Sequence, residues 1–304
     1  MLLLSTTIGN IIVLIASIKY KAFKLQKSIM IITQHVAISD ILWMFTYQVP
    51  QSLALVAEEW VLGDTMCSTV PHVMNYCGIV SMYLICTMTT CKAITLKFPL
   101  RSRARSTKSA HKLCAIAWAL ALNIPVTQVL LKIVGEGYTT FSYIRYECVY
   151  VSHHWLYLVM CGISLMIPNI MVVAATTYLL YKASKAARRS RNTVRWQGIM
   201  TTLLVAGVYC LSILPNGVLV LKELILDEHN PAQGSATEYR LADWVLLLNP
   251  FSNFYIYILT VRSFRNFLRS RVQQIKSSIR EDTMQSHTIE RRGCSGRIDL
   301  TIEH

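Results

Sequence analysis

Charged residues are scarce in this chain of 304 residues. They make up 15% of it, whereas a water-soluble domain carries roughly a quarter. Hydrophobic residues reach 53% and collect in long blocks with few charges. This distribution excludes an ordinary soluble domain and predicts an all-α membrane protein, a bundle of seven transmembrane helices. The blocks are Met1 to Ser17, Ile29 to Val56, Thr65 to Leu96, Leu113 to Ile133, Trp155 to Tyr181, Ile199 to Leu221 and Leu241 to Val261.

Acidic residues are missing from four of the segments that flank these blocks. Segments 18–28, 97–112, 182–198 and 262–280 contain lysine, arginine or both, but no acid. The other three connecting stretches hold nine acids against four bases, a net charge of −5. By the positive-inside rule we expect a plasma-membrane protein with an extracellular N-terminus and a cytoplasmic C-terminus. The net charge of +14 then reflects topology, and the expected partners of the basic residues are membrane lipids, not nucleic acid.

Catalytic motifs are missing as well. The sequence has no glycine-rich phosphate loop and no His-x-x-x-His pair, and no cysteine pair stands near His153 and His154 to complete a zinc site. We therefore do not expect an enzyme. A transporter or channel is a rival interpretation, but the seven blocks show no internal repeat and no matching pair of broken helices.

The first apolar block, at the N-terminal end, is short. The sequence has no Asn-x-Ser/Thr glycosylation site, and only ~17 apolar residues precede the first lysines, which is barely a membrane span. No small-residue cleavage site precedes those lysines, so a signal peptide is not expected. We expect an extracellular N-terminal segment to be missing from this sequence.

One carboxylate stands in the middle of the second apolar block. An intramembrane aspartate such as Asp40 costs several kcal/mol unless it faces a polar interior, so a functional role is the first interpretation. A structural hydrogen-bond hub is the alternative.

Several short features stand at particular places along the blocks: Gly9-Asn10, Asp40, Trp60-Val-Leu-Gly63 before Cys67, Pro99-Leu100, Trp118, Cys148, Pro168, Pro215 and Asn249-Pro250. In their order and near-spacing they resemble rhodopsin-like G-protein-coupled receptors, over all seven blocks. The resemblance implies an extracellular ligand and a heterotrimeric G protein as partners, and leaves arrestin open as a third. Within the family, segment 98–106 and Asn75-Tyr76 look most like galanin-, allatostatin- and kisspeptin-type peptide receptors.

Two of the nine cysteines, Cys67 and Cys148, fall at the expected outer face, where an oxidising compartment permits a disulfide. The resemblance implies the same pair. The loop around Cys148 is rich in aromatic and β-branched residues, which predicts a β-hairpin over the bundle. In the resembled family such a hairpin accompanies peptide ligands, although the tyrosines could also form an interfacial aromatic belt.

The resemblance places a ligand site between the outer helix ends. Asp243 stands where an opsin carries its retinal-binding lysine, and Met74 where amine receptors carry an aspartate, so a peptide is favoured over retinal or a monoamine. The acidic outer stretches favour a cationic ligand group. The candidate ligand-contacting residues are Gln48, Gln51, Met74, Tyr150, Asn216, Glu223, Tyr239 and Asp243.

A second candidate site is a sodium ion held by Asp40, Ser81 and Asn249, with Asn10 in the same polar core. A carboxylate and neutral oxygens suit such a hard cation. Family members that bind sodium also use polar groups where this chain has Val245 and Leu246, so the set is incomplete.

The signalling switch departs from the family pattern. Its Asp-Arg-Tyr is here Cys91-Lys92-Ala93, and its Asn-Pro-x-x-Tyr ends in Asn253. Lys92 keeps a cation but not the planar fork of arginine. Arg195, where many relatives have an acid, would repel it. The sequence thus favours weak coupling, with a signalling-silent scavenger or dimer-partner receptor as the alternative.

Prolines and the C-terminal segment complete the predicted layout. Pro168, Pro215 and Pro250 should break the fifth, sixth and seventh helices. Residues 1–273 form the receptor domain, which ends in a short amphipathic helix. Residues 274–304 are expected to be a disordered cytoplasmic tail.

Overall fold

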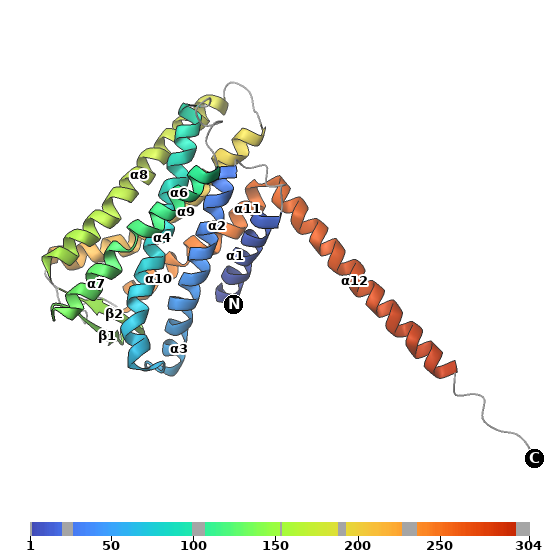
Figure 1. The fold of residues 1–304 in the computed structure, drawn as a ribbon, viewed down its shortest axis with the longest axis horizontal. Coiled ribbons are helices and arrows are strands. Elements are labelled where there is room, and N and C mark those ends of the chain that lie inside the picture. Colours follow the sequence, from blue (N-terminus) through green and yellow to red (C-terminus); the bar gives the residue numbers. More distant parts are fainter. Residues whose placement is uncertain are drawn as a thin grey trace, which may run out of the picture. The chain divides into compact units, whose positions relative to one another are not determined.

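The structure is built almost entirely from helices, with one short β-hairpin (Figure 1). It is a computed structural model that describes residues 2–19, 27–98, 107–152, 154–187, 193–226 and 236–295. Residues 1–261 form one compact unit, and residues 262–304 form a second. The elements of the first unit are α1 (Leu2–Lys19), α2 (Lys27–Trp43), the π-helical turn η1 (Met44–Gln48), α3 (Val49–Ala57), α4 (Gly63–Lys97), α6 (Thr107–Leu120), α7 (Asn123–Ile133), β1 (Tyr138–Ser142), β2 (Glu147–Val151), α8 (Trp155–Ala187), α9 (Thr193–Leu226), α10 (Ala236–Leu246) and α11 (Leu248–Thr260).

All seven predicted blocks lie on helices in the described part of the chain, which confirms the seven-helix bundle. Of the described helices, five are long and apolar enough to cross a membrane by themselves: Ser28–Ala57, Gly63–Lys97, Thr107–Ile133, Trp155–Lys185 and Gly198–Leu219. Leu3–Ile18 is apolar but shorter. Thr237–Thr260 passes the same test only together with Arg262–Arg280.

Prolines break this bundle at fewer places than predicted. Pro168 and Pro215 lie inside the continuous helices α8 and α9, so the predicted breaks there are wrong. Of these three predicted breaks, the one near Pro250 is present, between α10 and α11 at Leu247. A membrane helix can run through a proline because neighbouring helices and local adjustments satisfy the freed carbonyl groups.

The core is organised around α4. It is the most enclosed of the five long spans, with 61% of its apolar window buried, whereas α8 has 17%. One buried stripe of α4 carries Val80, Leu84 and Met88 at helical spacing, and α2 and α8 pack against this helix. The exposed apolar faces of α8 fit contact with lipid rather than water.

Helix α1 is held by a close approach to α11. A Cβ atom added at Gly9 would lie 2.9 Å from Cβ of Phe254, which only glycine avoids. The adjacent Asn10 donates from Nδ2 to the Pro250 carbonyl over 3.0 Å. The Gly9-Asn10 pair therefore fixes α1 on α11 by close packing and by one hydrogen bond.

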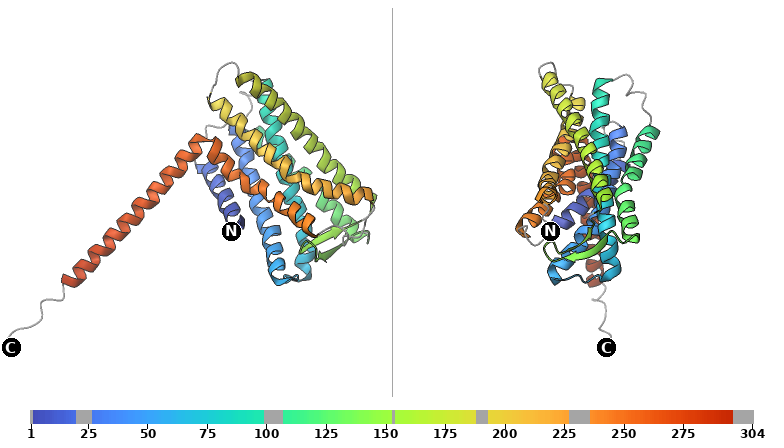
Figure 2. Two further views of the ribbon diagram at one scale, coloured as in Figure 1. Left: turned by 180° about the vertical axis from the view of Figure 1, so that it is seen from behind. Right: turned by 90° about the vertical axis from the view of Figure 1, so that its left-hand side faces the viewer.

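The predicted β-hairpin is present. Strands β1 and β2 pair antiparallel, with Phe141 opposite Cys148 and Tyr138 opposite Val151. Tyr146 has a positive φ of 53° in the connecting turn. Figure 2 shows the hairpin across the end of the bundle at which α3 ends and α4 begins. We call this the hairpin end.

The second unit begins with α12 (Arg262–Ser295). The predicted amphipathic helix is therefore present but not short, and it continues past residue 273, where the sequence analysis placed a disordered tail. Helix formers dominate this stretch, which lacks proline and has its first glycine at Gly293. Val272, Ile275 and Ile279 extend an apolar stripe at helical spacing. Residues 296–304 of the predicted tail lie outside the described residues.

Candidate functional site

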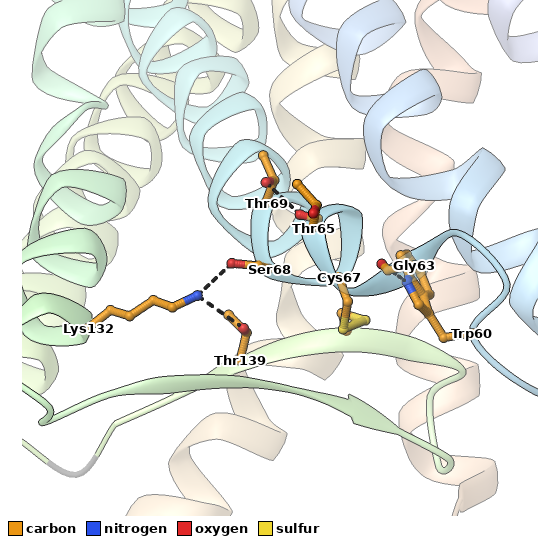
Figure 3. Close-up of a disulfide and its surroundings, with 9 residues drawn as sticks. Trp60, Gly63, Thr65, Cys67, Ser68, Thr69, Lys132 and Thr139 are labelled. Atoms are coloured by element: carbon orange, nitrogen blue, oxygen red, sulfur yellow. Dashed lines mark hydrogen bonds between the residues drawn. A yellow bond between two sulfur atoms is a disulfide. The ribbon is translucent and has the colours of Figure 1, made fainter.

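A disulfide ties the hairpin to the central helix. Cys67, in the first turns of α4, is bonded to Cys148 in β2, with their Cα atoms 5.2 Å apart, which confirms the predicted pair. The Lys132 ammonium from α7 donates to Ser68 beside the disulfide and, over 3.4 Å, to the Thr139 hydroxyl in β1 (Figure 3). Trp60 donates from its indole to the Gly63 carbonyl over 2.8 Å and braces the start of α4. Helix, strand and turn are thus fixed together at this end.

A buried carboxylate lies next to the disulfide. The Glu147 side chain is only 3% exposed, and its Oε1 lies 3.5 Å from Arg145 Nη1. Gln51, on α3, donates from Nε2 to Glu147 Oε2 over 3.3 Å and to the Arg145 carbonyl over 3.2 Å. The buried Tyr47 of η1 lies near the same carboxylate. These contacts anchor the turn of the hairpin to the second membrane span.

A second acid completes this group from α10. Asp243 is 8% exposed, and its Oδ2 is buried without a hydrogen-bond partner in the described part of the chain. Tyr239 lies one turn earlier on α10, and the Arg145 guanidinium stacks over its ring, 4.5 Å from the centroid. Arg145 therefore lies between Glu147 and α10. We call Tyr47, Gln51, Arg145, Glu147, Tyr239 and Asp243 the hairpin-end cluster.

The other predicted ligand residues surround this cluster to different degrees. Gln48 is buried and donates to Gln51 over 3.4 Å. Asn216 donates to the Ala242 carbonyl over 3.2 Å and joins α9 to α10. Met74 packs against the apolar group of Trp43, Met44 and Tyr47. The Glu223 side chain lies outside the described residues.

Tyr150 belongs to a neighbouring aromatic group. Its ring lies 5.6 Å from His72 and 5.2 Å from Tyr157, centroid to centroid. His72 Nδ1 and Gln128 Oε1 are 2.9 Å apart, and Gln128 Nε2 donates to Tyr157 over 3.1 Å. This network links α4, α7 and α8 beneath the hairpin.

Sequence reasoning missed Tyr47, Arg145 and Glu147. Glu147 directly precedes Cys148 and the apolar residues Val-Tyr-Val. The disulfide holds this strand against the bundle, so an acid at this position is expected to be buried. That signal was available. Tyr47 could not be found in this way, because its orientation depends on the π-helical turn that shifts the register of the second span.

Glu147 should make stability depend on pH. Burial, reinforced by repulsion from Asp243, raises the pKa of Glu147 from 4.5 to about 7. The native state then retains a proton that the unfolded chain has lost, so stability falls as pH rises between these values. The Tm of the purified wild-type protein should therefore fall as pH rises through this interval. We expect that fall to be smaller in Glu147→Gln, by roughly 5 °C. The exposed Glu136→Gln should leave the pH profile unchanged, and an unchanged profile in Glu147→Gln would contradict the assignment.

Asp40 lies at the centre of a mid-bundle polar cluster. Ser81 donates to Asp40 Oδ1 over 3.1 Å, and Asn253 donates from Nδ2 to Oδ2 over 2.7 Å. Asn249 Oδ1 and Asn10 Oδ1 are buried and without hydrogen-bond partners among the described residues. Oxygen atoms of the kind sodium prefers are therefore present, although both Asp40 oxygens already accept hydrogen bonds. Asn253, which the sequence analysis assigned to the switch, is a partner of Asp40.

The predicted switch residues other than Asn253 lie nearer the other end of the bundle. Cys91 and Lys92 are both buried in α4. Arg195 is on α9, but its side chain lies outside the described residues. Sequence reasoning overlooked Tyr257, one turn after Asn253, whose hydroxyl is 2.8 Å from Thr33 Oγ1 and links α11 to α2. Tyr257 stands four residues after Asn253 and so lies on the same face of the helix, which could have identified it.

Known proteins share this sequence pattern and this arrangement. G-protein coupled receptor 183-B of Danio rerio is 22% identical over 199 residues, which cover 61% of this chain and 54% of that protein. Rhodopsin of Procambarus milleri is 23% identical over 159 residues, which cover 49% and 52%. The chain thus spans about half the length of the curated relatives it matches.

The fold has a solved counterpart in squid rhodopsin. The two chains superpose with a TM-score of 0.72 at 15% identity. The match covers 90% of this chain and 83% of the squid rhodopsin chain. At this identity the likeness shows the fold alone. The family model described as 7 transmembrane receptor (rhodopsin family) matches residues 9–257, which is most of the chain and includes at least part of each of the seven predicted blocks. The chain is therefore a multi-pass membrane protein that belongs to the rhodopsin family of seven-transmembrane receptors.

Proposed function

We propose that this protein is a plasma-membrane receptor that binds an extracellular peptide with a cationic group at the hairpin end and signals weakly to heterotrimeric G proteins. The observation that carries the proposal is the hairpin-end cluster, which holds two buried acids and one arginine, paired with Glu147. The basic segments support an orientation with the hairpin end and the N-terminus outside and α12 inside.

A peptide suits this end better than retinal or a monoamine. Asp243 occupies the position of the opsin lysine and cannot form a Schiff base. Met74 offers no carboxylate to an amine. Segment 98–106 and Asn75-Tyr76 support a galanin-, allatostatin- or kisspeptin-type receptor as the finer assignment. The surplus of acids in the outer stretches would draw a cationic peptide toward the site.

Weak coupling is supported by the switch residues. Lys92 lacks the five-donor fork of arginine, Cys91 carries no acid, and Asn253 is engaged by Asp40 instead of offering a phenol. Arrestin remains a candidate partner. A sodium ion at Asp40, Ser81 and Asn249, with Asn10 alongside, is part of the proposal, and the orphaned Asn249 oxygen supports it.

Asp243 gives the proposal a direct test. A peptide library screened on cells for calcium, cyclic nucleotide and arrestin responses should yield agonists with a basic residue. We expect Asp243→Asn to weaken such an agonist by about tenfold or more, because a buried charge-assisted contact is lost. Glu223→Gln should act through a salt-sensitive association rate instead. Glu136→Gln, which neutralises an exposed acid, is the control and should bind the agonist as wild type does. If Asp243→Asn and Glu223→Gln both match wild type, the acidic charge is incidental.

A signalling-silent scavenger or dimer partner is the alternative function. The buried Lys92 and uncharged Cys91 favour it. Peptide uptake without any G-protein or arrestin response would support that alternative over the receptor proposed here.

A further inference from the structure

The hairpin-end cluster has an unbalanced charge. Glu147 and Asp243 are both buried, and Arg145 is the cation that pairs with Glu147 and stacks on Tyr239, one helical turn before Asp243. Arg240, the nearest other cation along α10, is exposed and engaged elsewhere: its guanidinium lies 5.1 Å from the Tyr146 ring centroid, and its Nε donates to the Ile144 carbonyl over 3.4 Å. The described cluster therefore carries one more formal negative charge than positive.

The hydrogen-bond acceptors show where this charge is unmatched. Glu147 Oε1 faces Arg145, and Oε2 accepts from Gln51. Asp243 Oδ2, by contrast, is buried and accepts no hydrogen bond from the described residues. A buried carboxylate oxygen without a donor is costly, so the free chain is poised to take a donor at this atom.

The existing arginine indicates which donor fits. Arg145 places a planar guanidinium between a carboxylate and the face of Tyr239, 4.5 Å from the ring centroid. A guanidinium combines a parallel set of donors with a flat, weakly hydrated face, and an ammonium does not. Arg145 also has a quarter of its side chain exposed, so it forms the solvent-facing edge of the cluster. A second guanidinium could approach Asp243 past this edge.

We propose that Asp243 Oδ2 is the acceptor of a specific subsite for an arginine side chain of the ligand, lying beside Tyr239 and the hairpin's own Arg145. The proposal deepens the proposed function, because it rests on ligand binding at the hairpin end. Arg145 remains on Glu147, and the ligand guanidinium supplies the missing positive charge at Asp243.

A small probe tests the subsite without knowledge of the natural ligand. The full chain, purified in detergent micelles, is heated with N-acetyl-arginine amide at pH 8, where a proton is least available to neutralise the acids. N-acetyl-citrulline amide, with the same shape and no charge, and N-acetyl-lysine amide serve as matched probes. We expect the arginine probe, at about ten times its Kd, to raise Tm by roughly 3 °C, the lysine probe by less and the citrulline probe not at all.

Two variants locate the effect. Asp243→Asn should remove the shift, and the exposed control Glu136→Gln should keep it. Arg145→Ala leaves two acids without their cation, so this variant should bind the arginine probe more tightly than wild type by at least about threefold and regain stability with it. An equal shift with citrulline, a shift that survives in Asp243→Asn, or no shift at pH 8 would each overturn the subsite.

The two proposals fail separately. A peptide agonist found in the screen, together with no effect of the arginine probe, would overturn only the guanidinium assignment. A probe that binds at Asp243 in a chain that answers no peptide would leave the subsite in place and overturn the signalling proposal.

Discussion

Cys67→Ser is expected to abolish surface expression or ligand binding. The disulfide joins α4 to β2 across 81 residues of chain, and closing a loop of that length constrains the unfolded state by about 4 kcal/mol. The larger effect is on the hairpin itself. Gln51, Arg145 and Glu147 depend for their contacts on β2 being held at the N-terminal end of α4. Loss of the bond should therefore release the hairpin-end cluster as a unit.

The measurement is surface labelling of an epitope-tagged receptor, followed by agonist binding on the fraction that reaches the surface. Cys148→Ser and the double variant should match Cys67→Ser, since each lacks the same bond. Cys210→Ser removes a free, half-buried cysteine and should express normally. Wild-type expression and affinity in Cys67→Ser would rule out an essential bond.

Restoring two switch residues is expected to increase signalling. The double variant Cys91→Asp and Lys92→Arg supplies an acid for the resting state and a planar fork for the G protein. The missing resting contact should raise basal opening, but the missing fork should reduce productive contact with the G protein, and we expect the second loss to dominate. Agonist-driven nucleotide exchange should rise on the order of tenfold, equivalent to about 1.4 kcal/mol or one charge-assisted hydrogen bond.

Asn253 is best left unchanged in this experiment. A tyrosine there would complete the family motif, but it would also remove the 2.7 Å hydrogen bond to Asp40 and leave a buried carboxylate oxygen without its donor. Nucleotide exchange is compared at equal surface density with a fixed panel of G proteins. Lys97→Arg, at the exposed end of α4, is the matched control. Equal rates in the double variant and wild type would show that Lys92 suffices.

The membrane spans were predictable because hydrophobic length is a property of local sequence. Apolar blocks and their basic flanks identify each helix without knowledge of its neighbours. The disulfide was predictable for a related reason, since only two of the nine cysteines fall at the expected outer face. The continuity of α8 and α9 through Pro168 and Pro215 was not, because it depends on neighbouring helices that satisfy the freed carbonyls.

The candidate site was only partly predictable. Asp40 and Ser81 were identified from single residues in apolar surroundings, and they do bond. The position of Asn253 suggested the switch, yet its bond partner lies more than two hundred residues away on α2. Glu147 and Asp243 come near enough to repel each other because a π-helical turn, a hairpin and a broken seventh helix bring them to the same end of the bundle, and no local sequence pattern predicts that arrangement.

The register of the hairpin has a consequence for biosynthesis. Phe141 pairs with Cys148, and successive side chains of a strand point to opposite faces, so Glu147 and Cys148 lie on opposite faces of the hairpin. A slip of one residue would turn the Cys148 thiol away from Cys67 and Glu147 away from Gln51 at the same time. The disulfide can thus form only when the two strands pair in the correct register. Its formation during maturation therefore separates correctly assembled chains from misaligned ones.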